Sequence, residues 1–275
     1  MIPITDTHAH IFPVEIASSA VEATSRFYAN VKAPLGVRRG IPCNYAGTAD
    51  DLLQRERDAG ISRALVFSCA TKISQVTSVN SFIAKVCAEH PSLVGAGTMF
   101  IGFPTPEEEC DRILSLGLKG IKLHPDIQRF AVDDERLFPV YEIMQEKGLF
   151  LISHAGDYRY DYSGPQRLRH VALMFPRLKL ICAHFGGWSE WGDAGEYLQK
   201  LDNVYFDTSS TIPFAGKEPA LAAFRRFDRT HIFFGTDYPM WDPKKELDTI
   251  LSLGLDDATL EGVLRTNFDT FLSAL

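Results

Sequence analysis

The sequence contains no apolar run that approaches the roughly 20 residues needed to cross a bilayer. Its first residues also lack the basic stretch and the following apolar stretch of a signal peptide. The five cysteines are scattered, odd in number and never in CxxC spacing, which argues against a disulfide framework and against a zinc ribbon. We therefore expect a reduced, cytoplasmic protein that does not associate with a membrane.

Positive charge is also scarce. The 28 lysines and arginines face 35 aspartates and glutamates, so the formal net charge is -7. Nucleic-acid binding usually depends on a basic face, so we expect a small-molecule substrate and no nucleic-acid partner. No Gly-rich fingerprint follows the first strand-like segment, which argues against a Rossmann fold. No Pro/Gly/Ser-rich linker divides the chain either, and we expect one domain over residues 1–275.

Short β-rich segments alternate with helical ones along the whole chain. The predicted strands are Ile4–His10, Ala64–Cys69, Leu93–Phe100, Gly120–His124, Leu149–His154, Leu178–His184, Val204–Thr208 and His231–Asp237. The predicted helices include Ala49–Ala59, Val79–Glu89, Glu107–Leu116, Phe138–Glu146 and Gln166–Phe175. Such alternation implies parallel strands joined by helical crossovers. Eight units match a closed (β/α)8 TIM barrel better than an open sheet.

The connection after the first strand is longer than a barrel needs. The helix Ala49–Ala59, capped by Thr48, uses only its last part. Residues 11–47 therefore exceed what the connection needs. They form either a surface loop or a lid over the end of the barrel at which the strands end. We favour the lid, because the loops that follow barrel strands build the active site.

Histidines gather where the predicted strands end. Residues i and i+2 of a strand face the same side, so His8 and His10 project together, with Asp6 one layer deeper. Later strands end in three more histidines and one aspartate, namely His124, His154, His184 and Asp237. Imidazoles and a carboxylate are natural ligands of a zinc-like divalent ion. The pattern predicts a catalytic metal site at the carboxyl ends of the strands.

These motifs resemble the amidohydrolase superfamily, and in particular its amidohydrolase-2 branch, which includes aminocarboxymuconate-semialdehyde decarboxylase. The resemblance covers Ile4 to Asn267 and is carried by "GIKLHP", "HAG", "SGPQRLRHVALMFPRLKLICAHFGG", "NVYFDTSS" and "FFGTDYP". It implies one divalent ion, expected to be zinc, bound by His8, His10, His154 and Asp237. It also implies that His184 is an acid/base group and that His124 faces the substrate or the metal.

The resemblance leaves two neighbouring residues open. In dinuclear members of the superfamily, a lysine at the position of Lys122 is carboxylated and bridges two ions. In this branch it is usually an ordinary amine, so we expect an ammonium paired with Asp237 or Asp6, and one ion. Asp207 either holds a group of the site or caps the barrel.

Loop residues are candidate substrate contacts. Arg38, Arg129 and Arg159 could bind a carboxylate, although a solvated loop charge is the simpler interpretation of each. Trp188 and Trp191 are expected either to line the substrate pocket or to be buried in the interface of a homodimer.

Two activities use the same residues. In a hydrolase of a small amide, lactone or ester, the ion activates a water, Asp237 carries its proton and His184 assists. The alternative is a lyase, a metal-dependent decarboxylase or hydratase of a small unsaturated or aromatic carboxylic acid. A non-catalytic barrel would be expected to have lost ligands, and none is missing here.

Overall fold

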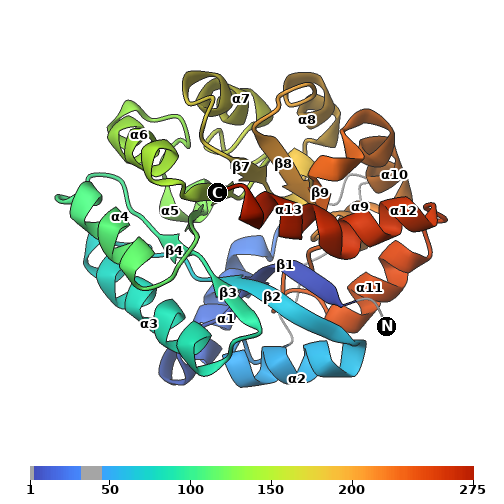
Figure 1. Cartoon of the computed structure of the whole chain (residues 1–275), viewed down its shortest axis with the longest axis horizontal. Helices are drawn as coiled ribbons and strands as arrows, with labels where there is room; N and C mark the ends of the chain where they lie inside the picture. The colour runs from blue at the N-terminus through green and yellow to red at the C-terminus, as the bar shows by residue number, and fades with distance from the viewer. Residues whose placement is uncertain (1–2, 32–44) are drawn as a thin grey trace.

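Parallel strands ring the centre of the molecule, and helices surround them (Figure 1). The structure is a computed structural model, and it describes residues 3–31 and 45–275. Its strands are β1 (Ile4–His10), β2 (Ile61–Phe67), β3 (Leu93–Gly95), β4 (Gly97–Thr98), β5 (Gly120–Leu123), β6 (Phe150–Ser153), β7 (Leu180–Cys182), β8 (Val204–Asp207) and β9 (Ile232–Phe233).

Two sheets, β1–β3 and β4–β9, join into one closed barrel. At the first seam, β3 and β4 are two parts of one strand that is interrupted at Ala96, whose N–H donates to the carbonyl of Val66 at 3.0 Å. At the second seam, the N–H of Thr7 donates to the carbonyl of Phe234 at 2.8 Å. Counting β3 and β4 as one strand, the barrel has eight, and the predicted (β/α)8 fold is confirmed.

The helices lie outside the strands and follow them in chain order. They are α1 (Val14–Tyr28), α2 (Ala49–Ala59), α3 (Val76–Glu89), α4 (Pro106–Ser115), α5 (Pro125–Gln128), α6 (Phe138–Lys147), α7 (Pro165–Met174), α8 (Trp191–Tyr197), α9 (Thr211–Ala215), α10 (Lys217–Arg226), α11 (Pro243–Leu251), α12 (Asp257–Glu261) and α13 (Asn267–Ser273). The bounds of α2 are those predicted, and Thr48 caps it by accepting from the N–H of Asp51. In the described part of the chain, no helix has both the length and the apolar character needed to span a membrane.

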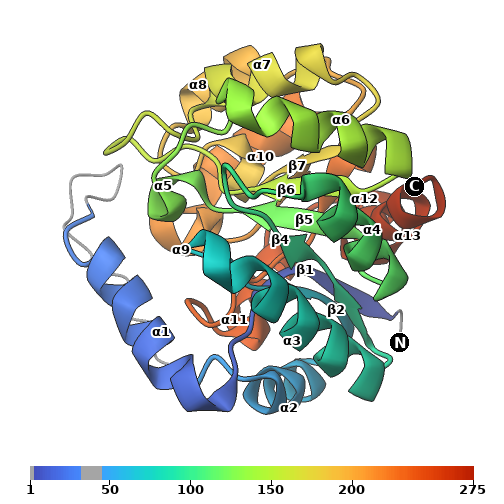
Figure 2. The same ribbon diagram turned by 90° about the vertical axis from the view of Figure 1, so that its left-hand side faces the viewer.

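Apolar side chains fill the barrel, and α13 covers one of its ends. Leu65, Phe150, Ile152 and Phe233 pack together in the interior with the α13 residues Phe268 and Phe271. Figure 2 shows α1 on the opposite side of the molecule from α13. The barrel is therefore closed below by α13, while α1 lies on the side where the strands end.

Only part of the predicted lid lies within the described residues. The helix α1 follows β1 directly, and within it only Ala17 and Tyr28 are buried. Residues 32–44, which include Arg38, lie outside the described part of the chain. That residues 11–47 act as a lid stays a prediction.

Candidate metal and active site

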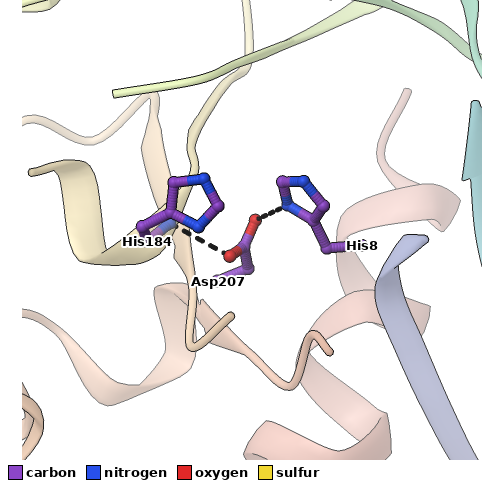
Figure 3. Close-up of side chains that lie close together, drawn as sticks. All are labelled: His8, His184 and Asp207. Carbon is purple, nitrogen blue, oxygen red and sulfur yellow. Dashed lines mark hydrogen bonds and ion pairs between the residues drawn. The ribbon is translucent and has the colours of Figure 1, made fainter. Parts of the chain in front are cut away.

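His8 is fixed in orientation by a buried carboxylate. Its Nδ1 lies 2.8 Å from Oδ2 of Asp207, so Nδ1–H donates to the carboxylate and Nε2 is left to face the site. Asp207 also accepts from the N–H of His184 at 3.0 Å, and it lies between the two histidines in Figure 3. Carboxylates that hold the far nitrogen of a ligating histidine are common around metal ions. Of the two roles considered for Asp207, holding a group of the site agrees with these contacts.

Three ligand atoms converge beside this pair. Nε2 of His8 and Nε2 of His10 lie 3.3 Å apart, and Oδ1 of Asp237 is 3.4 and 3.6 Å from them. Two imidazole nitrogens and one carboxylate oxygen within 4.8 Å of one another suit a divalent ion with an open position. The residues present therefore fit the metal that the sequence predicts.

The protonation states of the two histidines also favour metal binding. Burial, with a further contribution from Lys122, holds the pKa values of His8 and His10 well below their usual range, so both rings are neutral. Burial raises the pKa of Asp237 to about 7, although Ser210 Oγ donates to its Oδ2. Neutral imidazoles are the form that ligates a metal.

Two residues of the site have an unusual backbone conformation. His184 and Asp237 have φ values of 59° and 60°, in the left-handed region that non-glycine residues rarely adopt. β7 (Leu180–Cys182) and β9 (Ile232–Phe233) are shorter than the predicted Leu178–His184 and His231–Asp237, and the two residues lie in the segments that follow these strands. Such backbone conformations are concentrated at functional sites.

His154 and His184 form a second pair beside the three ligand atoms. Nδ1 of His154 lies 3.0 Å from Nε2 of His184, whose own Nδ1 lies 2.8 Å from Oγ of Ser209. Nε2 of His154 has no hydrogen-bond partner among the described residues and is 3.8 Å from Oδ2 of Asp126. His154 lies outside the group of His8, His10 and Asp237, so its role as a ligand stays a prediction.

Lys122 is buried next to His8. Its Nζ lies 3.3 Å from Nε2 of His8, and burial lowers its pKa. The expected ion pair with Asp6 or Asp237 is not formed. Asp6 instead accepts from the N–H of His8 and from both the N–H and the hydroxyl of Thr236, which satisfies it without the lysine.

His10 and Asp237 of the ligand group line a cavity of about 820 Å³. Its polar lining includes the residues around the site, namely His10, His124, His154, His184, Asp126 and Asp237. Much of the remaining lining is apolar and comes largely from α1 and α3. A cavity of this size and character is typical of a small-molecule site.

Two residues of this cavity were not predicted as site residues. The hydroxyl of Tyr28 lies 2.9 Å from Nε2 of His124, whose ring stacks on His154 with the centroids 4.1 Å apart. Asp126 accepts from Oγ of Ser163, and burial raises its pKa to about 7. A carboxylate two residues after His124 could have signalled Asp126. Tyr28 lies in the segment 11–47 that the sequence predicts as a lid, but nothing in the sequence indicates its contact with His124.

The predicted substrate contacts differ in their surroundings. Arg129 lines the cavity from an exposed position. The guanidinium of Arg159 donates twice to Asp157, at 2.9 and 2.7 Å, and once to the carbonyl of Phe27 at 2.6 Å, so its charge is already paired. Arg38 lies outside the described residues.

Trp188 and Trp191 contact residues of the site but do not line the cavity. Trp188 is fully buried and stacks on Phe214 with centroids 4.6 Å apart, next to Tyr28. It therefore backs the wall and is not among the residues that line the cavity. Trp191 donates from Nε1 to the carbonyl of His184 at 3.1 Å and so holds the turn in which that histidine lies.

The chain matches the amidohydrolase family over residues 5–267. No curated protein matches the sequence. Among solved structures, an uncharacterized TIM-barrel protein from Bordetella bronchiseptica is 20% identical, with a TM-score of 0.74 and 98% of each chain covered. The 5-carboxyvanillate decarboxylase LigW from Sphingomonas paucimobilis is 16% identical, with a TM-score of 0.74 and 99% of each chain covered.

A second 5-carboxyvanillate decarboxylase, from Novosphingobium aromaticivorans, is 14% identical with a TM-score of 0.75. The alignment covers 98% of this chain and 96% of that one, whose structure contains manganese and 4-hydroxy-3-methoxy-5-nitrobenzoic acid. Fold and site together define a barrel enzyme of the metal-dependent amidohydrolase superfamily. The chain belongs to the amidohydrolase family, in the amidohydrolase-2 group that the sequence motifs indicated.

Proposed function

We propose that this protein is a metal-dependent decarboxylase of a small aromatic or unsaturated carboxylic acid. The observation that carries the proposal is that the ligand group of His8, His10 and Asp237 opens, through His10 and Asp237, onto a cavity with aromatic and aliphatic walls. Those walls suit an apolar ring, while the ligand group suits the oxygen atoms of an acid. The names of the decarboxylases with the same fold state that they act on aromatic acids. This supports the proposal by analogy.

His8, His10 and Asp237 would hold the ion, together with His154 as the resemblance implies. When bound, the ion supplies positive charge that binds and orients the oxygen atoms of the substrate. Asp207 keeps Nε2 of His8 turned toward it. We retain zinc as the expected ion, with manganese as the other candidate, because a decarboxylase of this fold contains manganese.

The remaining polar residues would move the proton. In decarboxylation the bond between the ring carbon and the carboxyl carbon breaks, its electron pair stays on the ring carbon, and that carbon takes up one proton as carbon dioxide leaves. Asp237 and His184, which both line the cavity, are the candidate groups for moving this proton. The apolar walls would exclude water from the carbon that is protonated.

Hydrolysis of a small amide, lactone or ester is the second candidate, and it was placed first from the sequence. Membership of the amidohydrolase family favours it. It would use the same ligands, with Asp237 taking a proton from water instead of giving one to carbon. The predicted cytoplasmic location and the predicted homodimer are carried into either proposal.

A substrate panel separates the two candidates. Protein loaded with zinc or manganese is incubated with hydroxybenzoic and unsaturated acids, and separately with small esters, lactones and amides. We expect carbon dioxide release from acids, its loss after chelation, and its loss in Asp237→Asn. Turnover of the esters or lactones with no carbon dioxide from any acid would replace the decarboxylase by the hydrolase.

A further inference from the structure

The cavity is larger than a single-ring acid at the metal requires. Its volume of about 820 Å³ lies near the upper end of the range of roughly 300–1,000 Å³ found for pockets that enclose drug-sized ligands. The ligand group occupies only one part of its wall, and the rest is formed mainly by α1, α3 and the loops beside them. The additional space therefore needs an explanation.

One face of α1 looks into this space. The residues Ile16, Ala20, Ala23 and Phe27 recur at the spacing of a single helical face, and all four line the cavity. Ile16 is 51% exposed, although it is a large aliphatic residue. At 1.5 Å per residue, this face runs for roughly 16 Å along the helix.

A second part of the cavity wall is also apolar. Val79 and Phe82, one turn apart on α3, line the cavity and are only partly buried. We call the six side chains Ile16, Ala20, Ala23, Phe27, Val79 and Phe82 the tail pocket. Apolar surface left open inside a cavity is a common mark of ligand binding.

Contacts at both ends hold α1 across the opening. Just before the helix, the N–H of Phe12 donates to the carbonyl of Gly47 at 2.8 Å. At its last turn, Tyr28 contacts His124 and Arg159 donates to the carbonyl of Phe27. The last turn of α1 thus joins the tail pocket to His124, which lines the same cavity as His10 and Asp237.

We infer that the tail pocket binds an apolar substituent of the substrate, an alkyl or aryl chain, while the acid group lies at the metal. The position of the acid group rests on the proposed function, whereas the binding of an apolar chain does not. The substrate class is therefore an acid with a long apolar side chain. An unsubstituted single-ring acid would leave the tail pocket empty.

Calorimetry with salicylates that carry n-alkyl chains of zero, two, four or six carbons, at ring carbon 4 or 5, tests this. The metal-loaded protein should bind each longer chain more tightly in at least one series, by about fourfold per buried methylene group. Chain length without any effect on Kd in both series would overturn the inference.

Variants show where the chain lies. Ala23→Trp on α1 and Val79→Trp on α3 fill the tail pocket from two different helices, and both should abolish the gain in affinity per methylene group. Ser18→Trp is the matched control, because Ser18 is exposed on the other face of α1 and does not line the cavity. If the affinity still rises to the same extent per methylene group in both Ala23→Trp and Val79→Trp, the inference is also overturned.

The same measurements separate this inference from the proposed function. If unsubstituted salicylate binds only in the presence of the metal, the acid site is supported, whether or not the alkyl chains change the affinity. If the alkyl chains still raise the affinity by the expected factor after the metal is chelated, and if Ala23→Trp and Val79→Trp remove that increase, the tail pocket is supported independently of the acid site.

Discussion

Nδ1 of His8 lies 2.8 Å from Oδ2 of Asp207, and this contact determines which nitrogen of His8 faces the ligand atoms of His10 and Asp237. Both side chains are fully buried, so water does not compete for the contact. Asp207 forms a second group of three possible ligands with His8 and His184, and through His8 it acts on the group of His8, His10 and Asp237.

Asp207→Ala should therefore weaken metal binding without removing a ligand of that group. Partners of this kind typically contribute roughly 10–100-fold in affinity, so we expect a loss in that range. Competition with a chelator of known affinity measures it. Asp133→Ala is the matched control, because it removes a carboxylate 3.1 Å from Nδ1 of His170, an exposed histidine of α7. Equal affinities in the two variants would show that Asp207 does not orient a ligand.

Metal binding should release a proton in a pH-dependent way. In the metal-free protein the pKa of Asp237 is raised to about 7, so at pH 6 this carboxyl is mostly protonated and must lose its proton to bind an ion. The pKa values of His8 and His10 are well below the usual 6.5, so the two rings add little at that pH. Asp237 should contribute about 0.9 proton per ion at pH 6 and about 0.1 at pH 8.

Calorimetric titrations in two buffers of different ionisation enthalpy give the number of protons released. Asp237→Asn should remove the difference between pH 6 and pH 8, because the amide does not titrate. The same release at both pH values in the unmodified protein would mean that Asp237 is already ionised before the ion binds.

The barrel and the shared location of the histidines could be predicted because both follow from local pattern and strand direction. Alternation of strand and helix implies parallel strands, whose carboxyl ends meet at one end of a barrel. His8, His10 and Asp237 come together for that reason, although more than 200 residues separate the first from the last.

Other features depend on contacts that the sequence does not reveal. Arg159 was a candidate for binding substrate, but Asp157, only two residues away, pairs its charge. Tyr28 reaches His124 across 96 positions of sequence, through the path that α1 takes over the barrel. His184 and Asp237 lie beyond the ends of β7 and β9 and adopt positive φ values that favour glycine, which residue type does not predict.

His184 should be separable from the metal ligands by experiment. Its Nε2 faces His154, and its Nδ1 contacts Ser209, so we expect it to handle protons without binding the ion. His184→Asn should lower turnover by about 10²–10⁴-fold while metal content stays near one ion per chain. His170→Asn, which changes an exposed histidine, should alter neither quantity. Loss of the ion in His184→Asn would make His184 a ligand.

Lys122 decides whether the site holds one ion or two. A carboxylated lysine would require its amine to react with carbon dioxide, and burial lowers its pKa in the direction that favours the reactive neutral amine. Yet Nζ lies 3.3 Å from Nε2 of His8, where an unmodified amine can donate a hydrogen bond in the metal-free protein. We expect the amine to stay unmodified.

Protein produced with and without added bicarbonate should therefore contain about one ion per chain in both preparations, consistent with a mononuclear site that has one open position. Elemental analysis gives the ion count, and native mass spectrometry reports any carboxylated lysine. His8→Ala combined with His10→Ala is the control that should remove the ion and keep the fold, because packed layers below the site stabilise the barrel. Two ions per chain together with a carboxylated Lys122 would make the centre dinuclear, and His184 would then become a candidate ligand of the second ion.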